Sequence, residues 1–357
     1  MSGGAATPAS AGPLLDVKGL EVSFATEEGT VHAVDGVSFE LSPGEVLAVV
    51  GESGSGKSVT AMTLLGLTRY PNAHFEGSAH YKGTELIQAS EDQLRAIRGA
   101  EIAMIFQDPM TSLNPVQKIG NQIVEQIQEH EGSPNAEARE RTIELLERVG
   151  IPRARERIDS YPFEFSGGMR QRVVIAMALS CNPSILIADE PTTALDVTIQ
   201  AQILERIREL RDETNAAVIL VTHDLGVVAD VADRIAVMYA GRIIEQGTLD
   251  EIFYDPQHPY TWGLLGSITR VDRPRPERLP AIAGLPPSLA DRPEGCHFRP
   301  RCPHEFAECT KEPMLESRLE GQPDHTDRCW LSANEKRVKR EVRPGEIGLA
   351  SKEGAAA

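Results

Sequence analysis

The chain has 357 residues, of which 41 % are hydrophobic and 25 % are charged, and its formal net charge is −17. This composition is typical of a globular protein with a sizeable core, in one large domain or two of ordinary size. The negative charge disfavours nucleic acid as a partner and electrostatic docking on an anionic membrane, because both carry negative charge themselves. Any association with a membrane should therefore come through protein partners.

The beginning of the chain, MSGGAATPAS, has no Lys or Arg and no apolar segment, so we expect no signal peptide. No apolar run approaches the ~20 residues that a membrane helix needs. We therefore expect a cytosolic chain, in which disulfides are rare. Residues 1–13 are small and polar and are predicted to form a disordered tail.

The following segments alternate between strand and helix patterns. LLDVKGLEVSF and VHAVDGVSFEL alternate as strands do, and the turn sequence SPGE precedes a continuous apolar run at residues 46–50, typical of a strand buried on both faces. Further strands are predicted at residues 185–188 and 218–221, and helical spacing occurs at residues 116–149, 169–179 and 197–211. This alternation predicts a parallel sheet with helices on both faces.

A glycine-rich motif follows the predicted strand at residues 46–50. GESGSGKS fits the pattern GxxxxGK[ST] between a buried strand and an apolar helical stretch, which is the context of a phosphate-binding loop rather than of an ordinary turn. Its glycines let backbone N–H groups face phosphate oxygens, at the positive end of the next helix. Lys57 should reach the β- and γ-phosphates, and Ser58 should be a Mg²⁺ ligand. The predicted nucleotide-binding residues of this segment are Gly51, Glu52, Ser53, Gly54, Ser55, Gly56, Lys57, Ser58 and Val59.

Two later strands also end in polar residues. In ILIADE, Asp189 is predicted to hold Mg²⁺ directly or through water, and Glu190 to polarise the attacking water. The strand at residues 218–221 is followed by His223, which we interpret as a sensor of the γ-phosphate. All three motifs would then lie at the carboxyl ends of parallel strands, where ligands bind in open α/β sheets.

With these motifs the chain resembles the ATPases of ABC transporters. FSGGMRQR, which begins at Phe165, is similar to the signature motif of that family. It precedes the ILIADE strand at the spacing that the family has. Gln107 matches the Q-loop, Asp196 the D-loop and His223 the H-loop. Phe24 stands where the family has the aromatic residue that stacks on adenine. The resemblance covers residues 14–266.

The resemblance implies the roles of individual residues. ATP is the expected nucleotide, with Glu190, His223 and Gln107 as catalytic residues and with Ser58, Gln107 and Asp189 around Mg²⁺. The signature residues, which in this family bind the ATP of the opposite subunit, are Ser166, Gly167, Gly168 and Met169. The motif departs from the family pattern with Phe165 for the usual Leu and Met169 for the usual Gln. Because the serine and both glycines remain, we expect its function to be kept.

The resemblance also implies the fold. We expect an α/β P-loop NTPase of the ABC ATPase type, with a RecA-like core sheet, an antiparallel β subdomain, a helical signature subdomain at about 108–180 and a small cysteine-containing C-terminal extension. The expected domains are an ATPase domain at residues 14–266 and a peptide-permease-type extension at 267–335. Residues 336–357, which are charged and then rich in Ala and Gly, are predicted to be a flexible tail.

Three local features resemble the ATPase subunits of oligopeptide and dipeptide permeases: DPMTSLNP after Gln107, the FSGGMRQR form of the signature, and HPYT followed by a cysteine segment. We therefore expect ATP-driven peptide import by a chain that lies peripherally on the cytoplasmic side of the cell membrane. The implied partners are a second homologous ATPase subunit, two transmembrane permease subunits and an extracytoplasmic solute-binding protein, without nucleic acid.

Three other function classes are alternatives to this interpretation. A nickel or other solute importer is the first alternative, because its ATPase has much the same cassette. A soluble, non-transport ABC ATPase is more remote, because such proteins usually carry two cassettes or a long coiled coil. A P-loop GTPase would need an Asn-Lys-x-Asp motif, and the sequence contains none.

Four of the five cysteines, Cys296, Cys302, Cys309 and Cys329, gather near the C-terminus. Such clustering in a Pro-rich cytosolic segment suggests a metal centre that stabilises a region with little apolar core. Zinc sites usually contain a close Cys pair, which is missing here, and similar segments in peptide-permease ATPases are associated with a [4Fe–4S] cluster. We expect that cluster, with Zn²⁺ as the alternative and unliganded thiols as the third possibility. Substitute zinc ligands would be His297, His304 or His325, and the remaining Cys181 should be an ordinary buried thiol.

Overall fold

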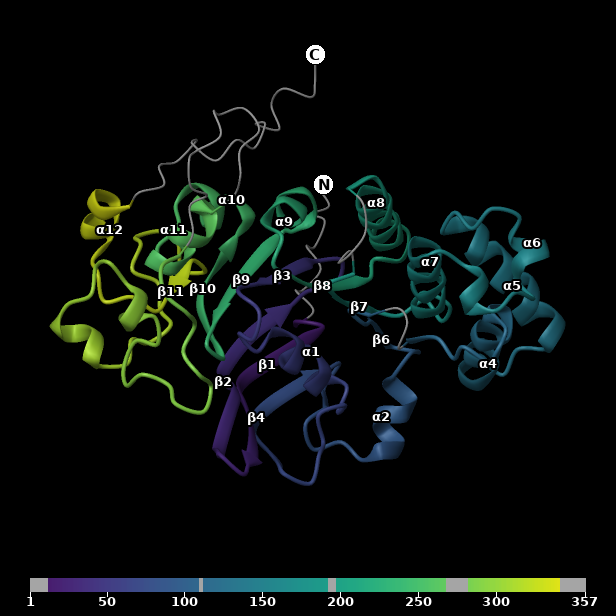
Figure 1. The fold of residues 1–357 in the computed structure, drawn as a ribbon, viewed down its shortest axis with the longest axis horizontal. Coiled ribbons are helices and arrows are strands. Elements are labelled where there is room, and N and C mark those ends of the chain that lie inside the picture. Colours follow the sequence, from purple (N-terminus) through teal and green to yellow (C-terminus); the bar gives the residue numbers. More distant parts are fainter. Residues whose placement is uncertain (1–11, 109–111, 192–196, 268–281, 341–357) are drawn as a thin grey trace, which may run out of the picture.

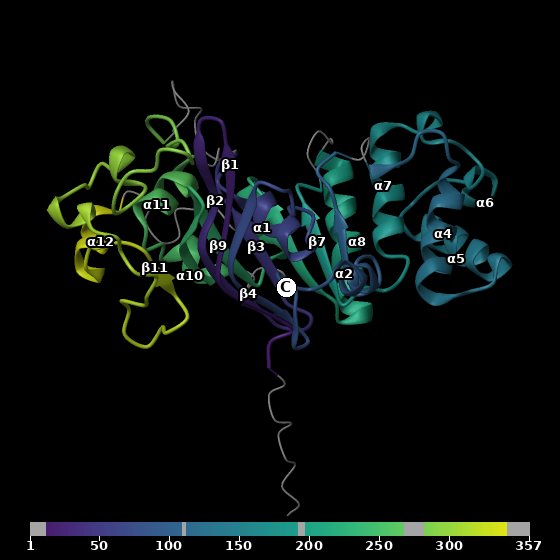
Figure 2. The ribbon, with the colours of Figure 1, turned by 90° about the horizontal axis from the view of Figure 1, so that it is seen from below.

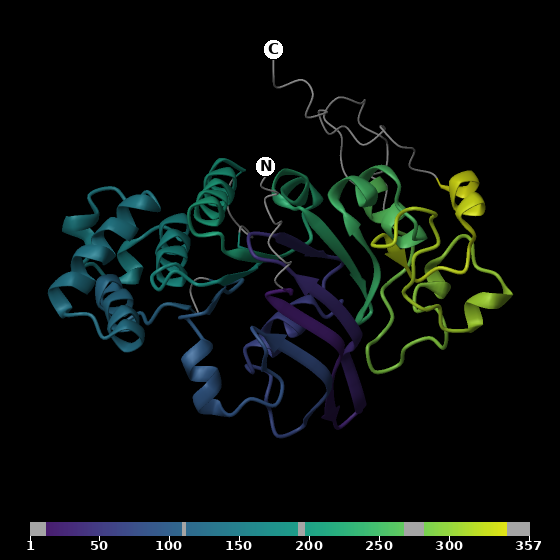
Figure 3. The same cartoon turned by 180° about the vertical axis from the view of Figure 1, so that it is seen from behind.

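The computed structural model describes residues 12–108, 112–191, 197–267 and 282–340. Figure 1 shows a central sheet with an antiparallel sheet beneath it, a helical lobe at one end and the C-terminal extension at the other. Figure 3 shows the same arrangement from behind, with the helical lobe and the extension on opposite flanks of the sheets. The expected combination of a core sheet, an antiparallel β subdomain, a helical subdomain and a C-terminal extension is therefore confirmed.

The central sheet has seven strands within the described residues, in the order β11-β10-β9-β3-β8-β7-β6. The strands span Thr326–Asp327 (β11), Arg242–Thr248 (β10), Arg234–Tyr239 (β9), Val46–Val50 (β3), Ala217–Thr222 (β8), Ile185–Asp189 (β7) and Ile102–Ile105 (β6). The pairs from β9 to β6 are parallel, and β10 runs antiparallel to both of its neighbours. Every residue of β3, β7 and β8 is buried, as their continuous apolar sequences predict.

The antiparallel sheet is built from the N-terminal third of the chain, in the order β2-β1-β4-β5. Its strands span Leu15–Thr26 (β1), Gly29–Leu41 (β2), Ala73–Tyr81 (β4) and Thr84–Glu85 (β5). Alternate residues of β1, such as Leu20 and Val22, enter a core that also contains Val49 of β3 and Leu64 of helix α1 (Lys57–Leu64). Figure 2 shows α1 between this sheet and the central strands. The antiparallel sheet therefore holds the helix that follows the glycine-rich loop.

The helical lobe consists of α4 (Ile119–Glu131), α5 (Asn135–Arg148), α6 (Ala154–Arg157) and α7 (Gly167–Ala178). Ile119, Ile123 and Ile127 have no exposed surface, which confirms the helical spacing seen in the sequence. The short helix α2 (Glu91–Ile97) precedes β6, and α8 (Val197–Thr214) lies between β7 and β8. Helix α7 begins two residues earlier than expected, because Ser166 is its N-cap and both glycines of the motif lie in its first turn.

The C-terminal part packs against β3 and against the strands from β9 to β11 of the central sheet. It contains α9 (Leu225–Val231), α10 (Leu249–Tyr254), α11 (Pro259–Gly266), the short 3₁₀ turns Arg299–Arg301 and Ala307–Thr310, and α12 (Ala333–Lys339). Strand β11 of the extension pairs with β10, and Phe298 enters the core beside Tyr239 and Tyr260. The extension therefore shares sheet and core with the part of the chain that precedes it.

The boundary of the C-terminal tail differs from the expectation. Residues from Lys336 were expected to be flexible, but α12 continues to Lys339. Lys336 is fully buried, and its ammonium lies 2.7 Å from both carboxylate oxygens of Asp327. The charged composition that suggests a loose tail here belongs instead to a helix that is held by a buried ion pair. Residues 341–357, the rest of the expected tail, lie outside the described residues, as does most of the N-terminal tail.

In the part of the chain that the structure describes, none of the helices combines the length and the apolarity needed to span a membrane.

Candidate functional site

The glycine-rich loop connects β3 to α1, as its sequence predicts. Gly51 has a φ of +154°, and a Cβ at this position would lie 2.1 Å from the carbonyl oxygen of Met238. Gly56, at φ +100°, caps α1, and a Cβ there would lie 2.3 Å from the carbonyl oxygen of Ala33. Neither position can carry a side chain without moving the backbone. The loop can therefore curl around an anion at the N-terminus of α1.

Lys57 points back into the loop. Its ammonium donates hydrogen bonds to the carbonyl oxygens of Gly51, at 2.8 Å, and Glu52, at 2.9 Å, and the residue is buried. Burial lowers the pKa of Lys57, against the opposing effect of Glu190 and Asp189. The loop thus encloses a cation close to two carboxylates, which is the charge arrangement expected of a site for a phosphate group and a divalent metal.

The two carboxylates at the end of β7 have different environments. Asp189 is buried and accepts a hydrogen bond of 3.0 Å from the Ser58 hydroxyl, and burial raises its pKa. Glu190 is partly exposed and lies between two other predicted residues: its Oε2 accepts from Gln107 Nε2 at 3.0 Å, and its Oε1 is 3.0 Å from His223 Nδ1. The structure therefore brings together the predicted catalytic and metal-binding side chains from three strand ends and α1.

The backbone of Glu190 is also unusual. Its φ is +46°, in the left-handed region that a residue other than glycine rarely adopts, and its N–H donates to the carbonyl oxygen of Val221 in β8 at 2.8 Å. Such conformations persist where the surroundings fix them, and they cluster at functional sites. Here the turn directs the carboxylate towards Gln107 and His223.

Gln107 begins the segment that joins the central sheet to the helical lobe. Farther along that segment, Asn114 exchanges two hydrogen bonds with Gln122 of α4, from its N–H at 2.9 Å and to its carbonyl oxygen at 3.0 Å. Leu113 is buried, whereas the side chain of Val116 is 79 % exposed. The segment is thus attached at one end to Glu190 and at the other to α4. Residues 109–111 of this segment lie outside the described residues.

The signature residues lie at the start of α7. The Ser166 side chain accepts a hydrogen bond from the N–H of Met169, and Ser166 and Gly167 are exposed. Phe165, which replaces the usual Leu, is buried in the core of the helical lobe. Figures 1 and 2 both show α7 in the helical lobe, away from α1, so the signature lies apart from the phosphate loop of its own chain.

Two further predicted residues are Phe24 and Asp196. Phe24 is half-buried near the end of β1, with its ring centroid 6.4 Å from that of Tyr70. Asp196, the predicted D-loop residue, lies outside the described residues.

Two side chains whose roles the sequence does not predict contact the phosphate loop. Tyr260 of α11 accepts a hydrogen bond from the N–H of Glu52 at 2.9 Å, and Arg301 of the extension pairs with the carboxylate of Glu52. Tyr260 belongs to the HPYT motif, so its sequence drew attention without revealing a role. Arg301 carries no such signal, because it is separated from Glu52 by 249 positions.

The four C-terminal cysteines line one small cavity, together with His304, Phe306 and Trp330 among others. Burial raises the pKa of Cys302 to about 11 and that of Cys329 to about 12. No group of three or more His, Cys, Asp and Glu side chains in the described ranges is arranged to hold a metal ion.

The remaining residues of the cysteine hypothesis are placed elsewhere. Two of the three substitute zinc ligands are engaged outside the cavity: His325 Nε2 lies 2.9 Å from Glu245, and His297 Nδ1 lies 3.2 Å from the carbonyl oxygen of Ala240. Cys181 is half-buried rather than buried, with its Sγ 3.7 Å from the Ser180 hydroxyl.

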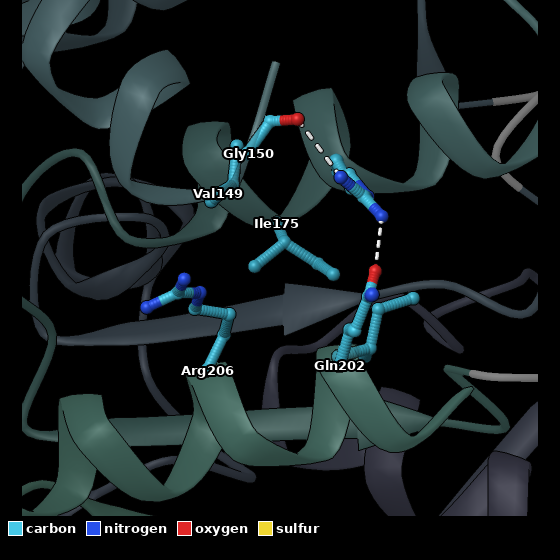
Figure 4. A pocket seen from close by; sticks show the side chains of 7 residues that line it. Val149, Gly150, Ile175, Gln202 and Arg206 are labelled. Atoms are coloured by element: carbon cyan, nitrogen blue, oxygen red, sulfur yellow. Dashed lines mark hydrogen bonds between the residues drawn. The ribbon is translucent and has the colours of Figure 1, made fainter. Parts of the chain in front are cut away.

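A cavity of about 260 Å³ lies at the junction of the helical lobe with α8. Arg172 of α7 donates hydrogen bonds to the carbonyl oxygen of Gly150, at 2.8 Å, and to Gln202 of α8, at 2.5 Å. Figure 4 shows Gly150 and Gln202 on opposite sides of this cavity. The lining residues are Val149, Gly150, Arg172, Ile175, Gln202, Ile203 and Arg206. None of the predicted site residues is among them, so this cavity is separate from the predicted nucleotide site.

Comparison with protein families gives two matches. The family described as ABC transporter matches residues 34–193, and the family described as the C-terminal region of oligopeptide/dipeptide transporters matches residues 244–309. The first match contains the phosphate loop, Gln107, the signature and the carboxylate pair. The second contains the HPYT motif and three of the four clustered cysteines.

Individual relatives are similar over nearly the whole chain. The dipeptide transport ATP-binding protein DppD of Bacillus subtilis is 51 % identical over 93 % of this chain and 98 % of its own length. The oligopeptide transport ATP-binding protein OppD of Haemophilus influenzae is 52 % identical over 90 % of this chain and 98 % of its own. Among solved structures, the ATP-binding cassette MJ0796, a dimer bound to ADP and Pi, aligns with a TM-score of 0.60 and 28 % identity over 66 % of this chain and 98 % of its own.

Proposed function

This chain belongs to the family of ATP-binding subunits of oligopeptide and dipeptide ABC transporters, and from that premise we propose that it hydrolyses ATP to drive the import of peptides. The observation that carries the ATPase assignment is Glu190, held between Gln107 and His223 beside the Ser58–Asp189 pair. The peptide cargo is supported by the match to the C-terminal region and by the names of the relatives. A nickel importer remains the alternative, because the cargo site of a transporter lies in other chains.

The proposed chemistry follows from the positions of the side chains. Lys57 and the N–H groups of the loop bind the phosphates of ATP, and the Ser58 hydroxyl, Asp189 and Gln107 would hold Mg²⁺, which supplies charge neutralisation when bound. Glu190 orients the attacking water and accepts its proton as the bond between the β-phosphate oxygen and the γ-phosphorus breaks. His223 holds the Glu190 carboxylate and reports the presence of the γ-phosphate.

Glu190→Gln tests these roles directly. The substitution preserves the shape of the side chain and removes the carboxylate that accepts the proton. We expect ATP binding to be retained and turnover at this site to be lost, measured by nucleotide titration and by phosphate release from the assembled transporter. Asp224→Asn is a matched control, because Asp224 is an acidic residue that caps α9 through the N–H groups of Gly226 and Val227. Full hydrolysis at both sites of the Glu190→Gln transporter would contradict the catalytic role of Glu190.

We propose that the signature completes a nucleotide site on a second subunit. Ser166 and Gly167 are exposed at the N-terminus of α7, where N–H groups can bind a phosphate, and they lie apart from the phosphate loop of the same chain. Two cassettes that close head to tail would each hold ATP between one loop and the opposite signature. The partner is a homologous ATPase subunit in a heterodimer.

The full assembly that we propose also contains two transmembrane permease subunits and an extracytoplasmic solute-binding protein, with this chain on the cytoplasmic side of the membrane. The segment from Gln107 to Pro115 is the proposed docking site for a short permease helix. Its attachment to both Glu190 and α4, and the exposed Val116 beside it, support this role. Cysteine pairs along 108–116 and a permease cytoplasmic loop should cross-link in the assembled complex. Their failure to cross-link in every nucleotide state would contradict it.

We further propose that Cys296, Cys302, Cys309 and Cys329 hold a [4Fe–4S] cluster with a structural role. The support is that all four thiols line the same cavity.

Protein purified without oxygen tests the cluster proposal. We expect it to be brown with about four irons per chain, and Cys302→Ser should bleach it, whereas Cys181→Ser, outside the cavity, should not. Colourless protein with one zinc would overturn the iron assignment, and metal-free protein would overturn the site.

A further inference from the structure

The C-terminal extension reaches the phosphate loop through one ion pair. Arg301 lies on the turn Arg299–Arg301, and its guanidinium binds both carboxylate oxygens of Glu52, from Nη1 to Oε2 at 2.6 Å and from Nη2 to Oε1 at 3.0 Å. Glu52 is the second residue of the loop motif GESGSGKS. Two parallel hydrogen bonds between a guanidinium and a carboxylate give the pair a fixed geometry.

Several contacts besides the ion pair hold the side chain of Arg301. Its side chain is only 4 % exposed. Nε donates to the carbonyl oxygen of Ala283 at 2.9 Å, Nη2 donates to that of Ile282 at 3.3 Å, and the guanidinium lies 5.7 Å from the ring centroid of Tyr239. Contacts from the extension and from β9 therefore set the position of the guanidinium.

Glu52 is fixed in turn on both its side chain and its backbone. Arg301 holds the carboxylate, Tyr260 accepts from the N–H, and Lys57 donates to the carbonyl oxygen at 2.9 Å. The charge of Glu52 is felt inside the loop: burial lowers the pKa of Lys57, and Glu52 is one of the carboxylates that oppose this shift. An uncompensated carboxylate at this position would repel the phosphates of an incoming nucleotide.

We propose that Arg301 is a positioning residue of the ATP site, which neutralises Glu52 and holds the phosphate loop in the shape that accepts ATP. The extension then packs against the ATPase domain and also contributes a positioning residue to its nucleotide site. Arg301 acts through Glu52 and need not touch the nucleotide itself. Because the effect is electrostatic, it is larger for ATP than for ADP, which carries one phosphate fewer.

The test measures ATP and ADP affinity by calorimetry on the full chain, with Glu190→Gln in every variant so that ATP is not consumed. Arg301→Gln should weaken ATP binding about tenfold and ADP binding less, because it leaves Glu52 charged and unpaired. Arg301→Lys keeps the charge and loses the two parallel hydrogen bonds, so its loss of ATP affinity should be intermediate. The difference from the parent chain should shrink at high NaCl, where charges are screened.

The second half of the test separates neutralisation from mere packing. Glu52→Gln removes the repelling charge and should tighten ATP binding, and the double variant Glu52→Gln with Arg301→Gln should recover most of the affinity lost by Arg301→Gln alone. If the ion pair is purely structural, Arg301→Gln and Glu52→Gln should each weaken ATP and ADP binding alike. The double variant should then bind ATP no more tightly than Arg301→Gln alone. Either that result, or unchanged ATP affinity in Arg301→Gln, would overturn the inference. If Arg301→Gln fails to fold, Glu52→Gln still decides: tighter ATP binding supports neutralisation, and weaker binding of ATP and ADP alike supports packing alone.

The inference rests on ATP binding at the phosphate loop, as proposed above, and the two can fail separately. A parent chain that binds no ATP would contradict the proposed function. A parent chain that binds ATP with the same affinity as all four variants would contradict only the role of Arg301.

Discussion

The buried ion pair between Lys336 and Asp327 gives a sharp test of how the extension is held. Both side chains are 1 % exposed, and the ammonium lies 2.7 Å from each carboxylate oxygen. Lys336→Met removes the charge, keeps the length of the side chain and leaves the buried carboxylate of Asp327 facing Arg318, whose Nη1 lies 3.5 Å from Oδ1. Removing one partner of a buried pair costs about 3 to 5 kcal/mol, because the other charge stays in a medium of low dielectric constant. We expect a loss of up to that size in the free energy of unfolding of the extension, because Arg318 compensates part of the charge of Asp327.

The loss should depend on pH in a definite direction. Burial raises the pKa of Asp327 to about 6, against the opposing effect of Lys336. A carboxyl group whose folded pKa lies above its unfolded value contributes stability that is full below the unfolded value of about 3.9 and is lost as pH rises through the folded value. Without Lys336 the folded pKa rises further. The deficit of Lys336→Met should therefore be larger at pH 8 than at pH 5.

The assay is urea unfolding followed by tryptophan fluorescence. Both tryptophans of the chain report on this region: Trp262 packs with Cys329 and Leu331, and Trp330 donates to the carbonyl oxygen of Lys311. Lys339→Met is the matched control, because Lys339 lies exposed on the same helix. Equal unfolding midpoints for Lys336→Met and Lys339→Met, at both pH values, would refute the reasoning.

Three further outcomes follow from individual contacts. Burial lowers the pKa of His258 to about 3. The stability that neutral His258 contributes is therefore present above its unfolded pKa of about 6.5 and is lost as pH falls from there towards the folded pKa. His258→Gln should make thermal stability depend less on pH in this acid range. Gly51→Ala would place a Cβ 2.1 Å from the Met238 carbonyl oxygen and should abolish ATP binding measured by calorimetry. Ser166→Ala removes the cap that accepts from Met169, which should cost about 1 kcal/mol in urea unfolding and reduce ATP hydrolysis by the assembled transporter.

Local sequence signals predicted the parts of the structure that depend on local physics. The strand at residues 46–50 is a continuous apolar run because both of its faces are buried, and the loop after it needs glycines because Gly51 and Gly56 approach neighbouring backbone closely. The carboxylates and His223 follow strands whose parallel arrangement brings their ends to one edge. The family resemblance then supplied roles that spacing alone does not give.

Contacts between distant segments could not be predicted in the same way. Strand β11 has only two residues, too few for any periodicity, and it forms because β10 offers a free edge. Lys336 looks like part of a solvated tail until its partner Asp327 is seen. Arg301 has no local pattern that points to Glu52, because that ion pair exists only after the extension has packed against the ATPase domain.

The central claim is that this chain hydrolyses ATP to drive peptide import. Its most direct test is to purify the complex that contains this chain from membranes, identify every subunit, and measure which solutes stimulate its ATPase in the presence of the solute-binding protein. We predict a second homologous ATPase subunit, two permease subunits, and stimulation by short peptides that is lost with Glu190→Gln. Stimulation by nickel but not by peptides, or purification of the chain without any membrane-spanning partner, would contradict the account.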